Sequence, residues 1–318
     1  MKIVSLDGQA LNPGDLSWAC FEKYGEVVVY PRTATTEETI ARLQGVDVLL
    51  VNKVPITEDV LAACPDLKLI CVLATGYNVV DCAAARKRGI PVCNVPDYST
   101  NAVSQFTFSL LLEICNRVGH HDRVVHEGKW SACPNFCFWD TPQMELAGKT
   151  MGVIGFGRIG RAVGRIATAF GMKVLAYNRS RCPEGEAIGT YTDLDTLLSK
   201  SDIVSLHLPL SPENTRMVND DFLGKMKDGA ILLNTARGGL IDEAALARAL
   251  ASGKLRAAAA DVVTSEPIPG DSPLLTAPNM VITPHMAWAP LEARQRILDI
   301  TVASIDGWLA GKPVHVVN

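Results

Sequence analysis

The sequence predicts an α/β protein with two doubly wound parallel-sheet domains, and three observations support this prediction. Short apolar runs alternate with longer segments of helical periodicity along most of the chain. The chain has 318 residues, which suggests two domains at about 100–200 residues per domain. The pattern changes around residues 99–101, where a long apolar helix is expected to link the first set of strands to a second set.

The first set of elements predicts a parallel sheet. Helices are expected between its strands, at Thr36–Leu43 and Ile56–Cys64. Alternation of apolar strands and helices is typical of a sheet that is covered by helices on both faces. The predicted strands are Lys2–Leu6, Glu26–Tyr30, Val46–Asn52, Leu67–Leu73 and Pro91–Val95.

The second set begins with a buried helix at Ala102–Cys115 and a polar loop at Gly128–Glu145. Six strands with intervening helices then match one doubly wound domain. An amphipathic helix, Leu291–Leu309, follows the last strand, and its apolar face is expected to hold Leu298, Val302, Ile305 and Leu309. The six strands are Thr150–Gly155, Lys173–Tyr177, Ile203–Leu208, Ala230–Asn234, Ala257–Val262 and Met280–Thr283.

Composition argues against several classes of function. The net charge is -4, so there is no basic excess of the kind that binds nucleic acid. No apolar run reaches the roughly 18–20 residues that span a bilayer. The nine cysteines show no Cys-x-x-Cys pair and no zinc-ligand spacing. Since the N-terminus also lacks the layout of a signal peptide, we expect free thiols, no metal and a cytoplasmic location.

A glycine-rich turn at Gly155, Gly157 and Gly160 follows the first strand of the second set. The first glycine permits a tight turn, the second lets a pyrophosphate approach the backbone, and the third lets helix and strand pack closely. A structural turn without ligand is the alternative, but the strand–turn–helix–strand context favours a dinucleotide. The helix after the turn is expected to bury Ile159, Ala162, Val163, Ile166, Ala167 and Phe170.

The end of the next strand bears on the choice of cofactor. NAD-binding sites normally have an acidic residue there, which binds the ribose 2′-hydroxyl. This chain has Asn178 instead, followed by Arg179, Ser180 and Arg181. Arginine and serine can bind a 2′-phosphate, so we favour NADP(H) over NAD(H). The alternative is that both arginines are solvated surface charges.

Three polar residues follow strand ends, where ligands bind in open α/β sheets. Arg237 can hold a substrate carboxylate and polarise a keto oxygen. His285 can act as the general acid that protonates this oxygen while the nicotinamide delivers hydride. Glu266 can orient the imidazole through its other nitrogen. Each residue alone would usually be structural, but together with the glycine turn they predict reduction of a 2-keto acid.

In these residues the chain also resembles the family of D-isomer-specific 2-hydroxyacid dehydrogenases. The segments Gly152–Gly171 and Ala230–Val263 are similar to the two signatures of this family, and Glu266-Pro267 and Pro284-His285 complete the pattern. The resemblance implies that Arg237, Glu266 and His285 are the catalytic residues. It also implies that a Rossmann-like cofactor domain, residues 100–286, is inserted into a flavodoxin-like substrate domain, residues 1–99 and 287–318.

The resemblance further implies that Thr75 and Gly76 bind the substrate carboxylate, and that two copies pair through the cofactor domain. Asp261 would lie near the nicotinamide carboxamide. The full set of expected cofactor-binding residues is Thr107, Gly155, Phe156, Gly157, Arg158, Ile159, Gly160, Asn178, Arg179, Ser180, His207, Leu208, Pro209, Thr215, Thr235, Ala236, Arg237, Asp261 and His285.

Within the family, the sequences ATGYNVVD and VCNVPDYST and the loop Gly128–Pro142 resemble the glycerate dehydrogenase, or hydroxypyruvate reductase, branch. This branch implies hydroxypyruvate or glyoxylate as substrate. The aromatic residues Phe136, Phe138 and Trp139 are expected to pack within an ordered loop, with approach to an active site as the alternative.

Proteins with other activities share parts of this pattern. Some relatives are dinucleotide-sensing corepressors with a similar catalytic set, and turnover of a keto acid would separate the two roles. Phosphite dehydrogenases share the arginine, glutamate and histidine. Formate dehydrogenases carry glutamine at the position of Glu266, which argues against that activity.

Overall fold

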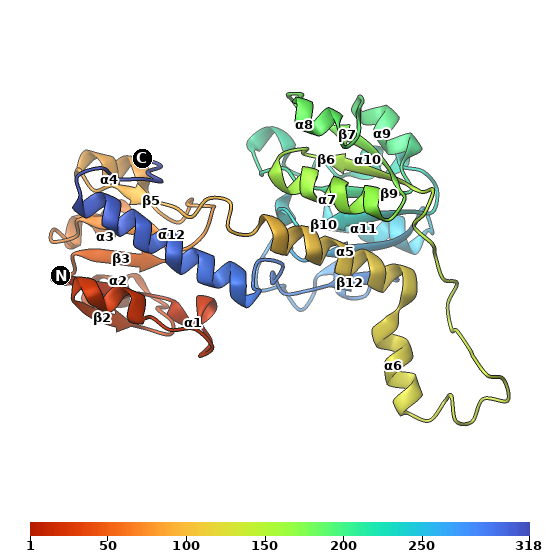
Figure 1. Ribbon diagram of the computed structural model, residues 1–318, viewed down its shortest axis with the longest axis horizontal. Coiled ribbons are helices and arrows are strands. Elements are labelled where there is room, and N and C mark those ends of the chain that lie inside the picture. Colours follow the sequence, from red (N-terminus) through yellow and green to blue (C-terminus); the bar gives the residue numbers. More distant parts are fainter. The chain divides into compact units, whose positions relative to one another are not determined.

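The computed structural model describes residues 1–318, which divide into two compact units (Figure 1). The first unit comprises residues 1–99 and 288–318, and the second comprises residues 100–287. The second unit is therefore an insertion in the first, and its end differs by one residue from the expected boundary. None of the helices combines the length and the apolar character that crossing a membrane requires.

The first unit contains a five-stranded sheet in the order β2-β1-β3-β4-β5. All of its neighbouring strands are parallel. This is the flavodoxin-like order, in which the strand order reverses between β1 and β3. Each predicted strand is present but shorter than expected, because the flanking apolar residues continue into loops. The strands are β1 (Lys2–Ser5), β2 (Glu26–Val29), β3 (Val48–Val51), β4 (Leu69–Val72) and β5 (Val92–Cys93).

Short capped helices connect these strands. Thr35, Thr57 and Asp81 each accept a hydrogen bond from a main-chain N–H in the first turn of the next helix, as N-cap residues do. The helical elements of this unit are α1 (Gly8–Leu11), η1 (Ala19–Tyr24), α2 (Thr36–Arg42), α3 (Glu58–Ala63), α4 (Cys82–Lys87) and α12 (Leu291–Leu309).

Helix α12 has the predicted bounds, but its buried face differs from the predicted one. Leu298 and Ile305 are buried as expected, whereas Leu309 is exposed. The buried stripe instead includes Thr301 and Ser304. Their hydroxyls donate to the carbonyls of the preceding turn, at 2.7 and 3.0 Å. These bonds satisfy both hydroxyls although they are buried. A search for apolar residues alone therefore does not find the buried stripe.

The second unit contains a seven-stranded sheet in the order β12-β11-β10-β9-β6-β7-β8, and all pairings are parallel. The order reverses between β6 and β9, as in dinucleotide-binding sheets. The edge strand β8 was not predicted, because two residues are too few to show a periodicity. The strands are β6 (Thr150–Ile154), β7 (Lys173–Tyr177), β8 (Thr190–Tyr191), β9 (Ile203–Leu206), β10 (Ala230–Asn234), β11 (Leu255–Ala260) and β12 (Met280–Ile282).

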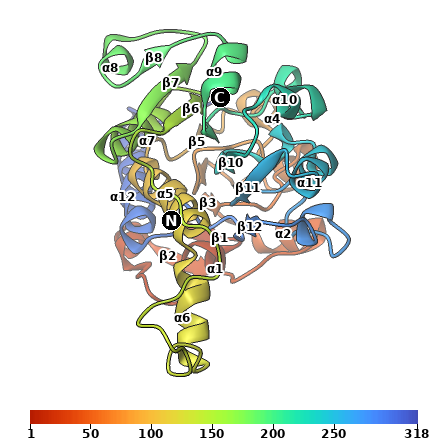
Figure 2. The same ribbon diagram turned by 90° about the vertical axis from the view of Figure 1, so that its right-hand side faces the viewer.

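Helices cover both faces of this sheet (Figure 2). Helices α5 and α7 share one core with its strands, and α9, α10 and α11 share the other. Phe170, predicted to be buried, follows the end of α7, is partly exposed and stacks on Phe108. The helical elements are α5 (Thr100–Asn116), α6 (Val118–His126), α7 (Arg158–Ala169), α8 (Pro183–Glu186), α9 (Leu194–Lys200), η2 (Pro212–Asn214), α10 (Asp220–Lys225), η3 (Gly238–Leu240), α11 (Glu243–Ala251) and η4 (Pro273–Leu275).

Helix α6 and the loop that follows it form an arm, residues 118–145, that projects from the rest of the second unit (Figure 1). The helix was not predicted, and it buries none of its residues. Only nine residues long, it lies between the long helix and the polar loop that the sequence predicts.

Candidate active site

The residues predicted for the active site in the second unit gather at one edge of its sheet. Because all seven strands are parallel, their carboxyl ends share this edge. The residues that directly follow β6, β9, β10, β11 and β12 are Gly155, His207, Thr235, Asp261 and Thr283.

The glycine turn lies at the point where the strand order reverses. Gly155 has a φ of 90°, and a Cβ atom there would lie 2.5 Å from the carbonyl oxygen of His207. A Cβ at Gly160 would collide with the main chain of Gly155, whereas one at Gly157 would meet no atom within 4 Å. Two glycines are therefore required by packing, and the third keeps one side of the turn open.

Helix α7 begins directly after Gly157, and no side chain caps its N-terminus. The first turn also contains no acidic residue. Main-chain N–H groups and the helix dipole at such an end attract phosphate. The open side at Gly157 and the uncapped helix thus fit the pyrophosphate of a dinucleotide.

The loop after β7 lacks a carboxylate at the position where NAD sites usually have one. Asn178 donates from Nδ2 to the carbonyl of Ser180 at 2.8 Å, and Arg179 and Ser180 are exposed. Sequence reasoning missed Arg161, in the first half of α7. Its guanidinium lies 3.5 Å from the Sγ of Cys182, in the same loop. The loop therefore has cations beside it, and two carboxylates interact electrostatically with them, Glu184 with Arg161 and Glu213 with Arg179.

His207, after β9, is uncharged at neutral pH. Burial lowers its pKa to about 3, and its Nε2 lies 2.8 Å from the hydroxyl of Ser205. The neighbouring position Thr235 is bonded to Thr107 of α5, with 3.0 Å between the hydroxyl oxygens. The structure thus joins two of the expected cofactor-binding residues, although they are 128 residues apart.

Arg237 extends from the turn after β10. Its guanidinium donates to the carbonyl of Ala236 at 2.7 Å, and no carboxylate forms an ion pair with it. A Cβ atom at Gly238 would collide with the main chain of Val263. The turn that carries Arg237 therefore lies directly against the segment that leads from β11 to Glu266.

Glu266 and His285 are in contact, with 2.7 Å between Oε2 and Nδ1. The other carboxylate oxygen, Oε1, accepts a hydrogen bond from the main-chain N–H of Val263 at 3.3 Å. About a third of each side chain is exposed. The carboxylate therefore bridges the backbone after β11 and the imidazole, which fixes the orientation of the ring.

Asp261 holds the turn that carries His285. Its buried carboxylate accepts hydrogen bonds from the Thr283 hydroxyl at 2.6 Å and from the N–H groups of Met286 and Ala287 at 2.9 and 2.8 Å. Its carbonyl accepts from the N–H of His285 at 2.8 Å. Burial raises the pKa of Asp261 in spite of these donors.

The backbone of His285 has a φ of 53°, in the left-handed region. Such a conformation costs a non-glycine residue about 1–3 kcal/mol, so surrounding bonds must hold it. The hydrogen bonds of Asp261 with this turn provide that support. The sequence suggested only a cofactor contact for Asp261, because its bonds to residues 283–287 depend on the pairing of β11 with β12.

The expected substrate-binding residues Thr75 and Gly76 belong to the first unit and follow β4 there. They are therefore not part of the group gathered by the second sheet. The Thr75 hydroxyl donates to the carbonyl of Val95 at 2.9 Å, and Asn94 donates to the carbonyl of Thr75 at 2.8 Å. These bonds attach the loop after β4 to the loop after β5.

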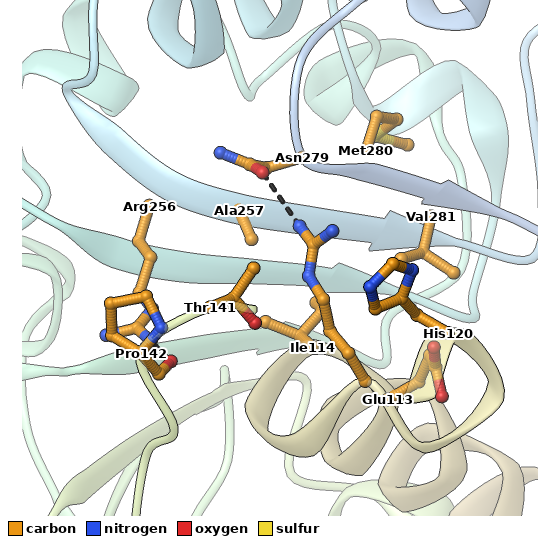
Figure 3. A pocket seen from close by; sticks show the side chains of 11 residues that line it. Glu113, Ile114, His120, Thr141, Pro142, Arg256, Ala257, Asn279, Met280 and Val281 are labelled. Atoms are coloured by element: carbon orange, nitrogen blue, oxygen red, sulfur yellow. Dashed lines mark hydrogen bonds between the residues drawn. The ribbon is translucent and has the colours of Figure 1, made fainter. Parts of the chain in front are cut away.

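A cavity of about 470 Å³ lies elsewhere in the second unit (Figure 3). It is lined by Arg256 at the start of β11, by Asn279 just before β12 and by residues of α5 and the arm. These are the amino ends of the strands, so the cavity lies at the edge opposite the glycine turn and His285. The cavity is therefore not the active site, because it lies away from the glycine turn and His285.

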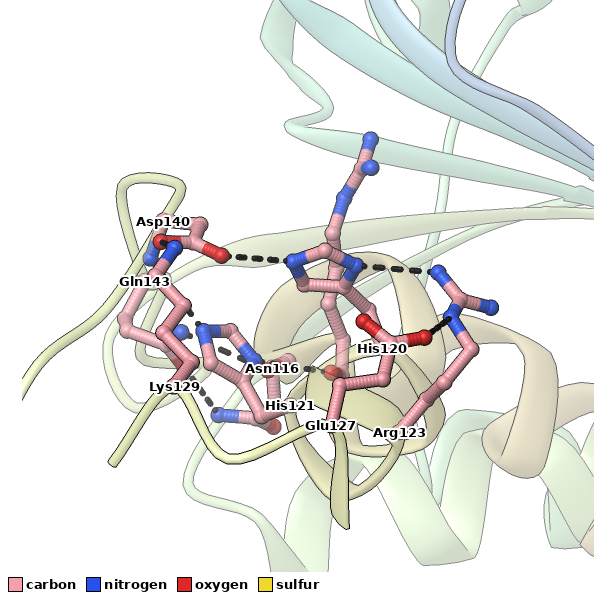
Figure 4. A network of polar contacts seen from close by, with 9 residues as sticks. Asn116, His120, His121, Arg123, Glu127, Lys129, Asp140 and Gln143 are labelled. Atoms are coloured by element: carbon pink, nitrogen blue, oxygen red, sulfur yellow. Dashed lines mark hydrogen bonds and ion pairs between the residues drawn. The ribbon is translucent and has the colours of Figure 1, made fainter. Parts of the chain in front are cut away.

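Polar contacts between residues of the arm hold its helix and its loop together (Figure 4). Asp140 pairs with His120 at 2.8 Å and with Lys129. Phe138 lies near Lys129, whose Nζ is 5.0 Å from the ring centre. By contrast, 89% of Phe136 and 65% of Trp139 are exposed. The expectation that these two aromatic side chains pack within the loop is therefore wrong, because the arm has no core that could receive them.

Comparison with known proteins agrees with this geometry. The family model described as D-isomer specific 2-hydroxyacid dehydrogenase, NAD binding domain, matches residues 108–287. A hydroxypyruvate reductase from Blautia hydrogenotrophica is 54% identical over all of both chains. A glycerate dehydrogenase from Methylorubrum extorquens is 41% identical over all of this chain and 99% of that protein.

Among solved structures, the apo-structure of D-lactate dehydrogenase from Escherichia coli aligns over all of both chains, with a TM-score of 0.87 and 28% identity. The glycine turn, the paired Glu266 and His285 and these full-length similarities agree with one another. The chain therefore belongs to the D-isomer specific 2-hydroxyacid dehydrogenase family, and the protein is a nicotinamide-dinucleotide-dependent oxidoreductase of 2-hydroxy acids.

Proposed function

We propose that the protein reduces hydroxypyruvate or glyoxylate to the corresponding 2-hydroxy acid. The contact of 2.7 Å between Glu266 and His285 is the observation that carries the proposal, because it prepares an imidazole for proton transfer at the edge that also bears the glycine turn. The names of the two relatives, hydroxypyruvate reductase and glycerate dehydrogenase, support this choice of substrates.

In this proposal a bound reduced nicotinamide supplies the hydride that reaches the keto carbon. His285 donates a proton from Nε2 to the keto oxygen, and Glu266 holds the opposite side of the ring through Nδ1. Arg237 binds the substrate carboxylate and polarises the keto oxygen. Thr75 and Gly76 bind the carboxylate through main-chain N–H groups. The same residues act in reverse when a hydroxy acid is oxidised.

The first unit is accordingly proposed as the substrate domain and the second as the cofactor domain. The residues of the glycine turn would hold the pyrophosphate, and the residues after β9, β10 and β11 would line the rest of the dinucleotide. The nine unpaired cysteines support a reducing compartment, the cytoplasm.

NADP(H) is the proposed cofactor. The exposed Arg179 and Ser180 and the amide of Asn178 can bind a 2′-phosphate. We expect a higher kcat/KM with NADPH than with NADH, and Arg179→Ala should reduce this preference by roughly 10-fold. Lys200→Ala, an exposed charge in α9 outside this loop, serves as the control. A wild-type preference for NADH would overturn the assignment.

Two copies are proposed to pair through the cofactor unit, with the arm as part of the interface. The exposed Phe136 and Trp139, together with Trp130, support this, since exposed apolar groups on a projecting segment are typical of association sites. Light scattering after gel filtration should give twice the mass of one chain. The double variant Phe136→Ser, Trp139→Ser should shift the protein towards the monomer, whereas a wild-type monomer would refute the pairing.

The substrate is tested by initial rates with hydroxypyruvate, glyoxylate, pyruvate and phenylpyruvate, each with NADPH and NADH, and by phosphite oxidation with the oxidised cofactors. Hydroxypyruvate or glyoxylate should give the highest kcat/KM. A strong preference for phenylpyruvate would exclude the proposed substrates, and turnover of phosphite alone would replace the proposed reaction.

A further inference from the structure

The sheet of the first unit has its own reversal of strand order, between β1 and β3. In open parallel sheets, ligands bind outside the carboxyl ends of the strands at this point. Asp7 follows β1 here, and Asn52, Lys53 and Val54 follow β3. None of these four residues belongs to the site predicted from the sequence.

The carboxylate of Asp7 binds the backbone of the loop after β3. It accepts hydrogen bonds from the N–H groups of Asn52 at 3.0 Å, Lys53 at 2.6 Å and Val54 at 3.3 Å. Only 7% of Asp7 is exposed. Burial of a carboxylate is costly unless such donors surround it, so this contact fixes the backbone of the loop.

The fixed loop presents one cation. Lys53 is exposed, whereas its neighbours Asn52 and Val54 are buried. No carboxylate forms an ion pair with the ammonium group of Lys53. In the same unit, by contrast, the ammonium of Lys68 lies 2.6 Å from the carboxylate of Asp47.

The loop with Lys53 is next to the loop proposed to bind the substrate carboxylate. Strands β3 and β4 are adjacent and parallel, and the N–H of Leu73 donates to the carbonyl of Val51 at 2.8 Å, just beyond the paired residues. Lys53 thus stands two residues after Val51, and Thr75 two residues after Leu73, at the same edge of one sheet.

We propose that Lys53 binds the carboxylate of the 2-keto acid, together with the main-chain N–H groups of Thr75 and Gly76. The inference rests on the proposed function, since it assigns an additional cation to the same substrate. Asp7 is a positioning residue in this arrangement, because it holds the backbone from which the ammonium extends.

The test is Lys53→Met, which removes the charge and keeps an unbranched side chain. A charge-assisted hydrogen bond to a carboxylate corresponds to roughly 10- to 150-fold in kcat/KM. We expect a loss in that range, mostly as a higher KM. Because the carboxylate is common to all substrates, the loss should be similar for hydroxypyruvate and glyoxylate. Lys53→Arg, which keeps the charge, should recover part of the activity.

Lys87→Met is the matched control, since it removes an exposed lysine from α4 of the same unit and should leave KM unchanged. NADPH affinity and the melting temperature of Lys53→Met, measured in parallel, should equal those of the wild type. Unchanged KM values in folded Lys53→Met would overturn the inference. A loss confined to hydroxypyruvate would overturn it too, because the lysine would then bind the hydroxymethyl group.

Failure of this inference is distinct from failure of the proposed function. If the wild type reduces no 2-keto acid, the proposed function is wrong. If the wild type is active and Lys53→Met matches it, only the role of Lys53 is wrong.

Discussion

Each unit has a buried aspartate just past the carboxyl end of one of its strands, but the two aspartates support different groups. Asp7 follows β1 and accepts only main-chain N–H groups, from the loop that presents Lys53. Asp261 follows β11 and accepts two main-chain N–H groups and a hydroxyl, from the turn that presents His285. In each unit, a buried carboxylate fixes the backbone beneath a more exposed side chain. The difference lies in the presented group, the ammonium of Lys53 in one unit and the imidazole of His285 in the other.

The largest effect should come from the imidazole itself. His285→Asn should lower kcat by about 10²–10⁴-fold, because it removes the general acid. Binding of NADPH, followed by fluorescence titration, should remain close to that of the wild type. Glu266→Gln is expected to cause a smaller loss of kcat, since the imidazole keeps a polar side chain beside Nδ1 but loses the negative charge of the carboxylate. Near-normal turnover of His285→Asn would exclude His285 as the acid.

The next largest effect should distinguish the two aspartates, because their variants are expected to change different kinetic constants. Asp261→Asn replaces an acceptor of the His285 turn with an amide, and we expect kcat to fall by about 10-fold or more as the ring loses its orientation. Asp7→Asn should instead raise the KM for hydroxypyruvate and leave kcat nearly unchanged.

Each of the two aspartate variants should also lose about 1–3 kcal/mol of stability from unsatisfied buried donors, measured by urea unfolding. Identical kinetic changes in the two variants would show that both aspartates are merely structural. The conservative variants Asp7→Glu and Asp261→Glu test whether geometry or charge is required.

The last effect concerns stability rather than turnover, and it involves His207 at the reversal point of the second sheet. Burial lowers its pKa to about 3 from the ordinary 6.5. The unfolded chain therefore binds a proton that the folded chain does not, between pH 6.5 and about 3, and stability falls as the pH decreases through this range. His207→Gln should show a shallower decrease of the unfolding free energy. The same slope in both proteins would contradict the burial of a neutral imidazole.

The sequence predicted the parallel strands, the glycine turn and the position of Arg237, Glu266 and His285 at strand ends. It missed β8, which has only two residues, and α6, a short helix between the predicted long helix and the predicted loop. It also assigned Phe136 and Trp139 to packing in the loop, since an aromatic residue is usually buried and only the structure shows that the arm has no core.

The sequence by itself thus determined most of the strands and the glycine turn, because periodicity and turn chemistry are encoded in neighbouring residues. Only the tertiary structure decided which side chains meet. The bonds from Asp7 to residues 52–54 span about 45 residues, and Glu266 meets His285 across 19. Such contacts depend on strand order and register, which arise when apolar strands from distant segments pack into one sheet.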